Sequence, residues 1–124
     1  MPIFYEGWGL IKEHVGTRNY AGLFDVSHMG QIKVYGADRK SFVNRIFTTD
    51  LDKLTPNSAA LSLILNHSGG IIDDSVVTMF EDHYSIVLNA GNKHIDMAHM
   101  NQELSEGFKG KDIRIETLFE DKAL

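Results

Sequence analysis

The sequence has no cysteine, only two prolines and one tryptophan, and no long apolar run. Without cysteine, disulfides, thiolate metal ligands and thiol nucleophiles are excluded together. No apolar segment approaches the ~18 residues of a membrane-spanning helix, and the first residues lack the pattern of a secretory signal. The chain has 12 basic and 17 acidic residues, for a net charge of −5. Neither a membrane nor a nucleic acid is therefore expected as a partner, since phosphate backbones bind basic surfaces.

The composition is that of a globular domain. The chain has 124 residues, of which 43% are hydrophobic and 23% charged, enough to build the core of one domain of ordinary size. The six histidines show no metal-ligand spacing, and the chain has no H-E-x-x-H or Walker motif. No metal site is predicted.

Hydrophobic periodicity predicts an α+β fold. A first helix is expected over 9–18 and a strand within 23–30, and neither has a clear place in the sheet that follows. From residue 31 the order strand, helix, three strands, helix, strand predicts a mostly antiparallel sheet with helices on one face. This is a ferredoxin-like variant with one extra strand. The predicted elements are strands at 31–34, 59–65, 71–80, 84–89 and 113–118 and helices at 37–47 and 92–104.

The helix predicted over 92–104 has an apolar side that includes Met97 and Met100. Asp96 and Glu103 are counted among the polar residues between these apolar positions.

Two adjacent acids, Asp73 and Asp74, follow the Gly69-Gly70 turn inside a predicted strand. Asp is depleted in strands and a buried unpaired carboxylate is costly, so the pair marks a candidate functional site. Side chains alternate along a strand, so the two acids point to opposite faces and do not share a proton with each other. The alternative is that both accept N–H bonds from the Gly-Gly turn.

Asn89 ends the next predicted strand, which is joined to the first by a short hairpin. An amide and a carboxylate on neighbouring strands are able to converge on one heteroaromatic ring. The alternative for 89–91 is a plain turn.

Three long motifs carry a family resemblance: AGLFDVSHMGQ (21–31), LSLILNHSGGIIDDSVV (61–77) and YSIVLNAGNKHIDMAHM (84–100). In this order and spacing they resemble the glycine cleavage system T-protein family, the tetrahydrofolate-dependent aminomethyltransferases. The folate domains of sarcosine and dimethylglycine dehydrogenases are related, but the FDVSHMG motif is closer to the T-proteins. The resemblance covers essentially the whole chain.

The resemblance implies transfer of a methylene group from the aminomethyl-lipoyl group of an H-protein to tetrahydrofolate, with release of ammonia. Asp74 would be the catalytic residue, positioning the cofactor and handling a proton as N5 becomes nucleophilic. Leu61 stands where some members carry Tyr. The cofactor-binding residues implied by the resemblance are Met29, Asp74, Val76, Val87 and Asn89.

Family members are about three times as long, so the resemblance implies an N-terminal portion of a T-protein. Residues 1–29 would belong to an incomplete first domain and 30–124 to a folate-binding α+β subdomain. Such a portion is expected to bind folate weakly, to turn over little, and to self-associate through its exposed N-terminal segment. The family acts in the bacterial cytoplasm or the mitochondrial matrix. Two alternatives stay open, a non-catalytic folate-binding or interaction module and a folate domain of an amine dehydrogenase.

Overall fold

A computed structural model of the chain describes residues 7–119 and 123–124. Residues 1–6 of the predicted segment 1–29 and residues 120–122 of the predicted segment 30–124 lie outside the described residues. The described residues form three helices and five strands. Each element predicted from residue 31 onward is confirmed to within three residues at its ends. The elements are α1 (Leu10–Asn19), β1 (Gly30–Tyr35), α2 (Arg39–Ile46), β2 (Ala59–Leu65), β3 (Ile71–Met79), β4 (His83–Leu88), α3 (Lys93–Gly107) and β5 (Arg114–Thr117).

The strands form one sheet in the order β2-β3-β4-β1-β5, and every neighbouring pair is antiparallel. Two connections cross the sheet: α2 carries the chain from β1 to the far edge strand β2, and α3 carries it from β4 to β5. Strand β2 lies at the edge of the sheet, where it pairs with β3 and forms one isolated antiparallel bridge from Ile64 to Phe47. The expected α+β class is confirmed.

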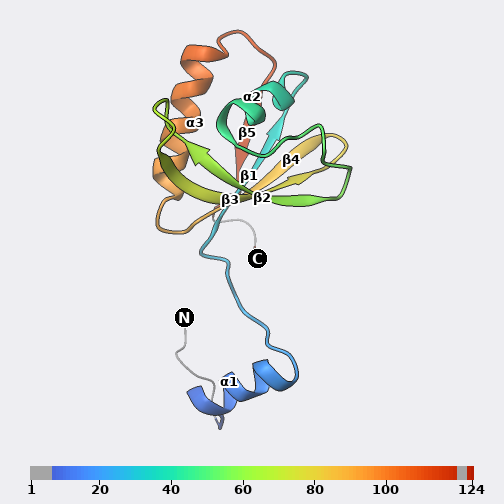
Figure 1. Cartoon of the computed structure of the whole chain (residues 1–124), viewed down its shortest axis with the longest axis vertical. Coiled ribbons are helices and arrows are strands. Elements are labelled where there is room, and N and C mark those ends of the chain that lie inside the picture. The colour runs from blue at the N-terminus through green and yellow to red at the C-terminus, as the bar shows by residue number, and fades with distance from the viewer. Residues whose placement is uncertain (1–6, 120–122) are drawn as a thin grey trace.

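One face of the sheet is covered by α2 and α3 (Figure 1). Burial alternates along the central strands, because successive side chains of a strand point to opposite faces. The inward side chains of β1 and β4 meet the apolar stripe of α2 and a methionine of α3. The residues at the centre of this core are Ile32, Val34, Phe42, Val43, Ile46, Ile86, Leu88 and Met100.

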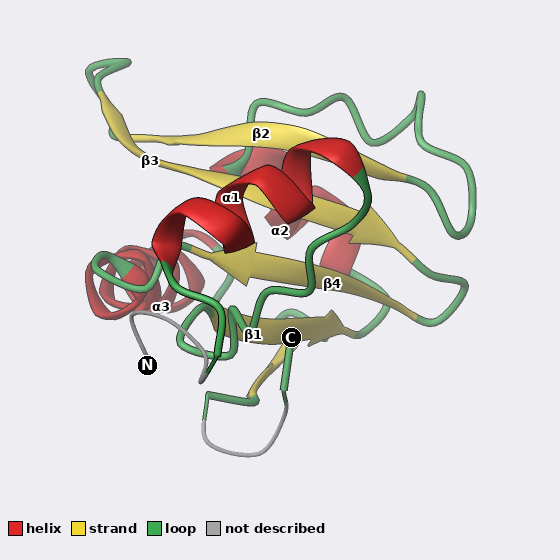
Figure 2. Ribbon diagram, turned by 90° about the horizontal axis from the view of Figure 1, so that it is seen from below, coloured by secondary structure: helices red, strands yellow, loops and turns green. Residues whose placement is uncertain are grey.

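The opposite face of the sheet is open. Leu61 is 71% exposed and Val76 is also exposed there. Figures 1 and 2 show that α1 lies beyond this face, at the end of an extended segment, with α2 and α3 behind the sheet. Helix α1 has no buried residue. No helix within the described residues is long and apolar enough to span a membrane.

The strand expected within 23–30 is wrong. Residues 21–26 have no regular secondary structure, 27–29 form a turn and bend, and only Gly30 is in a strand, as the first residue of β1. Leu23 is 96% exposed. The N–H of Val26 donates to the carbonyl oxygen of Leu124 (3.1 Å), but one bond does not build a ladder. A strand needs a neighbour to pair its backbone groups, so β-like composition alone does not make one.

The placement of Asp96 and Glu103 among exposed polar residues is also wrong. Asp96 is fully buried and Glu103 is 5% exposed. Both lie at helical spacing from buried Met100, four residues before it and three after, so they share its inward stripe. The hydrophobic pattern counted both acids with the polar positions. Glu103 is held inside by Arg45 and His67, whereas neither oxygen of Asp96 accepts a hydrogen bond from the described residues.

Truncating side chains on the two faces of β2 should lower the free energy of unfolding by different amounts. We expect Ile64→Ala, at a fully buried position, to lower the free energy of unfolding by about 2–5 kcal/mol, because it leaves a cavity. The matched change Leu61→Ala on the open face of the same strand should cost less than about 1 kcal/mol. Urea denaturation of the 124-residue chain measures both. Equal losses would mean that the Leu61 face is covered in solution.

Candidate functional site

The acids of β3 lie on opposite faces of the sheet, as predicted. Asp73 is 8% exposed and continues the buried side with Ser75, whereas Asp74 is exposed and continues the open side with Val76. The pair therefore offers one carboxylate to the core and one to solvent.

The antiparallel register brings the predicted apolar site residues together on the open face. Val76 of β3 stands opposite Leu61 of β2 on one side and Val87 of β4 on the other. Gln31 of β1 follows beside Val87. These four side chains form a row across four strands, mostly apolar, over which a flat ring is able to lie.

A second row runs beside the first. Asp74 stands opposite Leu63, and Asn89 follows directly after Leu88, the last residue of β4. Met29 precedes Gly30, which pairs with Leu88, so continuing this register sets Met29 beside Asn89. The five residues implied by the resemblance thus occupy neighbouring positions of the sheet.

Asn89 bridges the two acids. Its Nδ2 lies 2.9 Å from Asp73 Oδ1, 2.9 Å from Asp74 Oδ1 and 3.2 Å from the Asp74 carbonyl oxygen. Two carboxylates demand a donor between them, so the nitrogen and not the oxygen of the amide points this way. The 89–91 segment is therefore more than a plain turn, although the Asn89 carbonyl oxygen also accepts from the N–H groups of Asn92 and Lys93.

Asp73 is held as a carboxylate. Burial raises its pKa, but the hydrogen bond from the Asn89 side chain and the Asp74 N–H, with smaller contributions from the nearby Asn92 and Asp96 side chains, together bring that pKa below its ordinary value.

Asp96 behaves in the opposite way. Burial, followed by repulsion from the Asp73 charge and a side-chain hydrogen bond with Asp73, raises the pKa of Asp96 to about 7. Sequence analysis missed this residue. Its spacing from Met100 on one helical stripe is the signal that identifies it.

The Gly69-Gly70 turn does not rely on the acids. Asn66 Oδ1 accepts from the N–H groups of Ser68 (2.9 Å) and Gly70 (2.8 Å). Gly69 has φ 80°, a conformation that suits glycine. The alternative that Asp73 and Asp74 serve this turn is replaced by an asparagine that caps it.

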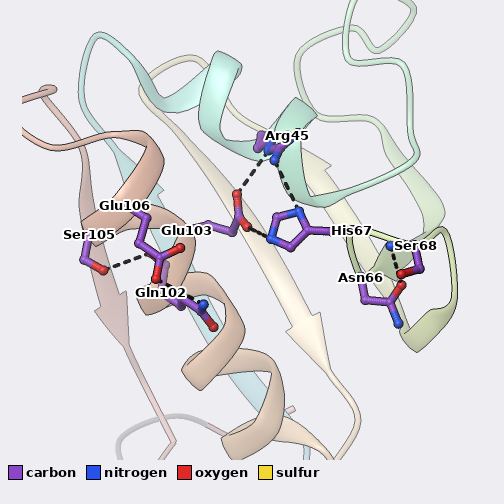
Figure 3. A network of polar contacts seen from close by, with 8 residues as sticks. All are labelled: Arg45, Asn66, His67, Ser68, Gln102, Glu103, Ser105 and Glu106. Carbon is purple, nitrogen blue, oxygen red and sulfur yellow. Dashed lines mark hydrogen bonds and ion pairs between the residues drawn. The ribbon is translucent and has the colours of Figure 1, made fainter.

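The turn is tied to both covering helices by buried Glu103 (Figure 3). Glu103 Oε1 lies 2.9 Å from His67 Nε2, and Glu103 Oε2 lies 3.1 Å from Arg45 Nε. Arg45 of α2 also lies 3.4 Å from His67 Nδ1. This contact from α3 to α2 and the turn fixes where β3, with its two acids, begins.

Two hollows lie away from Asp74 and Asn89. One of about 440 Å³ lies over Arg45, His67 and Glu103. Another of about 1060 Å³ is lined by α1 and the segment after it. Asp74 and Val76 are exposed, so the candidate site lies on an open sheet face.

Comparison with known proteins identifies the family of the chain. The family model described as the GCVT N-terminal domain matches residues 1–123. The chain belongs to this family. Members of the GCVT family named aminomethyltransferase match it closely in sequence. The mitochondrial one from Dictyostelium discoideum is 42% identical over 106 residues, which cover 86% of this chain and 26% of that protein. The one from Desulforamulus reducens is 45% identical over 97 residues, 77% of this chain and 26% of that protein.

A solved GCVT-family structure agrees in fold. The crystal structure of glycine cleavage system aminomethyltransferase T from Bartonella henselae superposes with a TM-score of 0.80 at 34% identity, covering 90% of this chain and 30% of that one. The chain thus spans about a quarter to a third of the length of these relatives.

The Glu103 cluster predicts a selective loss of stability. Glu103→Ala removes the shared partner of Arg45 and His67, both of which water also reaches, so we expect a cost of about 1–2 kcal/mol. Glu106→Ala, which removes an exposed acid bonded to Gln102, should cost less than about 0.5 kcal/mol. Urea denaturation compares the two variants. Equal costs would show that the cluster does not anchor the turn.

Proposed function

We propose that the open sheet face forms part of the tetrahydrofolate site of a glycine cleavage aminomethyltransferase. That enzyme would transfer a methylene group from an aminomethyl-lipoyl H-protein to tetrahydrofolate and release ammonia. The observation that carries this proposal is the exposed Asp74 carboxylate, held by Asn89 beside the apolar Val76–Val87 row. Family membership supports it.

The residues of this face fit a reduced pterin. Its pyrimidine ring is flat and the pterin carries N–H donors, so it calls for an apolar surface beside an acceptor. Val76 and Val87 provide the surface, and Met29 stands at its margin. Asp74 Oδ1 is taken by Asn89, and among the described residues no donor is assigned to Asp74 Oδ2. The second oxygen is free to accept from a ligand.

The roles follow from these positions. Tetrahydrofolate, when bound, supplies the nucleophilic nitrogen N5. Asp74 Oδ2 would accept a hydrogen bond from the ring and hold a proton close to N5. Asn89 keeps Asp74 in one orientation, and the valines exclude water from one side of the ring. Asp73, turned into the core, positions Asn89.

The N-terminal segment fits a different role. Residues 1–29 are proposed to belong to a first domain, distinct from the folate-binding unit 30–124, because α1 buries none of its residues and the segment after it exposes Leu23 and Phe24. The fold of 30–124 corresponds to a ferredoxin-like variant. Relatives named mitochondrial and relatives from bacteria support the mitochondrial matrix or bacterial cytoplasm as the compartment.

Folate binding is expected to depend on Asp74. Asp74→Asn removes a charged acceptor, and we expect it to weaken tetrahydrofolate binding about 10–100-fold, the value of one charge-assisted hydrogen bond. Calorimetry and NMR shift mapping on the 124-residue chain measure this, with Glu81→Gln, an exposed acid beyond β3, as the control. Perturbations should gather at Val76, Val87 and Asn89. Perturbations on α2 and α3 instead, or none at millimolar ligand, would rule the site out.

Ammonia release separates the enzyme from its alternative. With tetrahydrofolate and aminomethyl-loaded H-protein, we expect the 124-residue chain to release ammonia slowly, and Asp74→Asn to lower this rate by about 10²–10⁴-fold, the usual contribution of a general acid or base. Folate binding without any ammonia release would favour a non-catalytic folate-binding module.

Self-association is expected through the N-terminal segment. Its exposed apolar side chains favour contact between copies, so the apparent mass by light scattering should rise with concentration. The double change Leu23→Asp with Phe24→Asp should reduce this rise. Ile95→Asp, at an exposed apolar position on α3, should not. A constant monomer mass for the unmodified chain would refute the expectation.

A further inference from the structure

Two buried carboxyl groups meet beneath the open face, and three of their four oxygens have no donor. Asp96 of α3 is fully buried and Asp73 of β3 nearly so. Asp73 Oδ2 and both Asp96 oxygens accept no hydrogen bond from the described part of the chain. Buried carboxylates without donors are costly, so this arrangement requires an explanation.

A cation does not provide it. The described residues contain no cluster of three or more His, Cys, Asp or Glu side chains suited to a metal. Asp73 is the charged group that acts on Asp96, and the neighbouring Asn89 and Asn92 are uncharged. The other titratable side chains of α3 near Asp96 are engaged elsewhere: Lys93 with the His28 carbonyl oxygen, His99 with the His67 ring, and Glu103 with Arg45.

A single proton removes most of this cost. On Asp96 it neutralises one of two like charges and gives Asp73 Oδ2 the donor that it lacks, and the other Asp96 oxygen then belongs to a neutral acid. We propose that Asp96 is a positioning residue: its protonated carboxyl group donates to Asp73 Oδ2, and this singly protonated pair holds the Asn89 amide in place. Asp73 Oδ1 then remains available to accept from Asn89, at 2.9 Å.

The buried Asp73–Asp96 pair is connected to the open face through Asn89. Asn89 Nδ2 carries two hydrogens and lies 2.9 Å from both Asp73 Oδ1 and Asp74 Oδ1. One hydrogen serves the buried acid and the other the exposed one. A chain of four side chains therefore connects the proton on Asp96 with the carboxylate of Asp74. The effect on folate binding rests on the proposed function, whereas the singly protonated Asp73–Asp96 pair is independent of it.

The sign of the pH dependence follows from linkage. The pKa of Asp96 is raised from 3.8 to about 7, so between these values the folded chain keeps a proton that the unfolded chain has lost. The folding equilibrium constant should fall about tenfold per pH unit as pH rises across this window, and level off above it. Asp73, whose pKa is lowered, contributes in the opposite sense, and its contribution is lost as pH falls below 3.8.

Asp96→Asn tests the pair, since its amide keeps a donor toward Asp73 but does not ionise. Urea unfolding is measured from pH 4 to 8 for the unmodified chain, Asp96→Asn and Met97→Leu, a change beside it on α3 that alters no ionisable group. We expect the stability ratio of Asp96→Asn to the unmodified chain to grow about tenfold per pH unit up to pH ~7 and then to level off. Met97→Leu should keep the slope of the unmodified chain. Parallel profiles for the unmodified chain and Asp96→Asn would overturn the proposal.

A spectroscopic titration tests positioning directly, and without folate. We expect the Asp96 carboxyl carbon and the Asn89 side-chain amide to shift with one common midpoint near pH 7, while the Asn44 amide does not follow it. Asp96→Asn should abolish the pH-dependent shift of the Asn89 amide. A shift caused by a titrating histidine would persist in this variant, so the comparison separates the two causes. If that variant does not fold, the unmodified chain still decides. A midpoint near pH 4 for Asp96, or an Asn89 amide that does not follow it, would refute the proposal. A coupled titration without folate binding would uphold the pair and reject the proposed function.

Discussion

The side-chain amide of Asn89 lies between two carboxylates, and the geometry of the open face depends on this contact. The pleat of β3 sends Asp73 into the core and Asp74 to solvent. Neither acid has a basic partner among its assigned contacts, so each must be satisfied by neutral donors. From the end of β4, the short side chain of Asn89 reaches both. A single residue thereby couples the two faces.

Beneath this contact the fold accepts two acids where apolar side chains would pack at lower cost. A buried polar group strengthens its hydrogen bonds in a low dielectric and is penalised when they are absent. With Asp73 ionised and Asp96 protonated, Asp73 Oδ2 gains a donor and Asp96 carries no buried charge, so both penalties are reduced. Helix α3 therefore does more than cover the sheet: it carries Asp96 toward the candidate site and Glu103 toward the turn that starts β3.

The division of the sheet into a covered and an open face suits the proposed folate site. The helices, the core and the Glu103 cluster make the covered side rigid. The register on the other side aligns valines in one row with an acid and an amide in the next. A flat ring placed there would find an apolar surface and a held carboxylate on elements that do not need to move, which favours preorganised binding.

The sequence by itself determined the elements from residue 31 onward, the antiparallel order and the opposite facing of Asp73 and Asp74, because these follow from periods of 3.6 and 2 along the chain. The motifs also identified the family, which the comparisons confirm. The tertiary structure decided the rest. The expected strand at Leu23 found no pairing partner, and Asp96 and Glu103, which their polarity assigned to the surface, are buried. The bridge from Asn89 to both acids likewise joins residues 15 and 16 positions apart. Local pattern says which side a residue prefers, whereas hydrogen-bond partners brought from distant positions decide whether a polar group is able to stay inside.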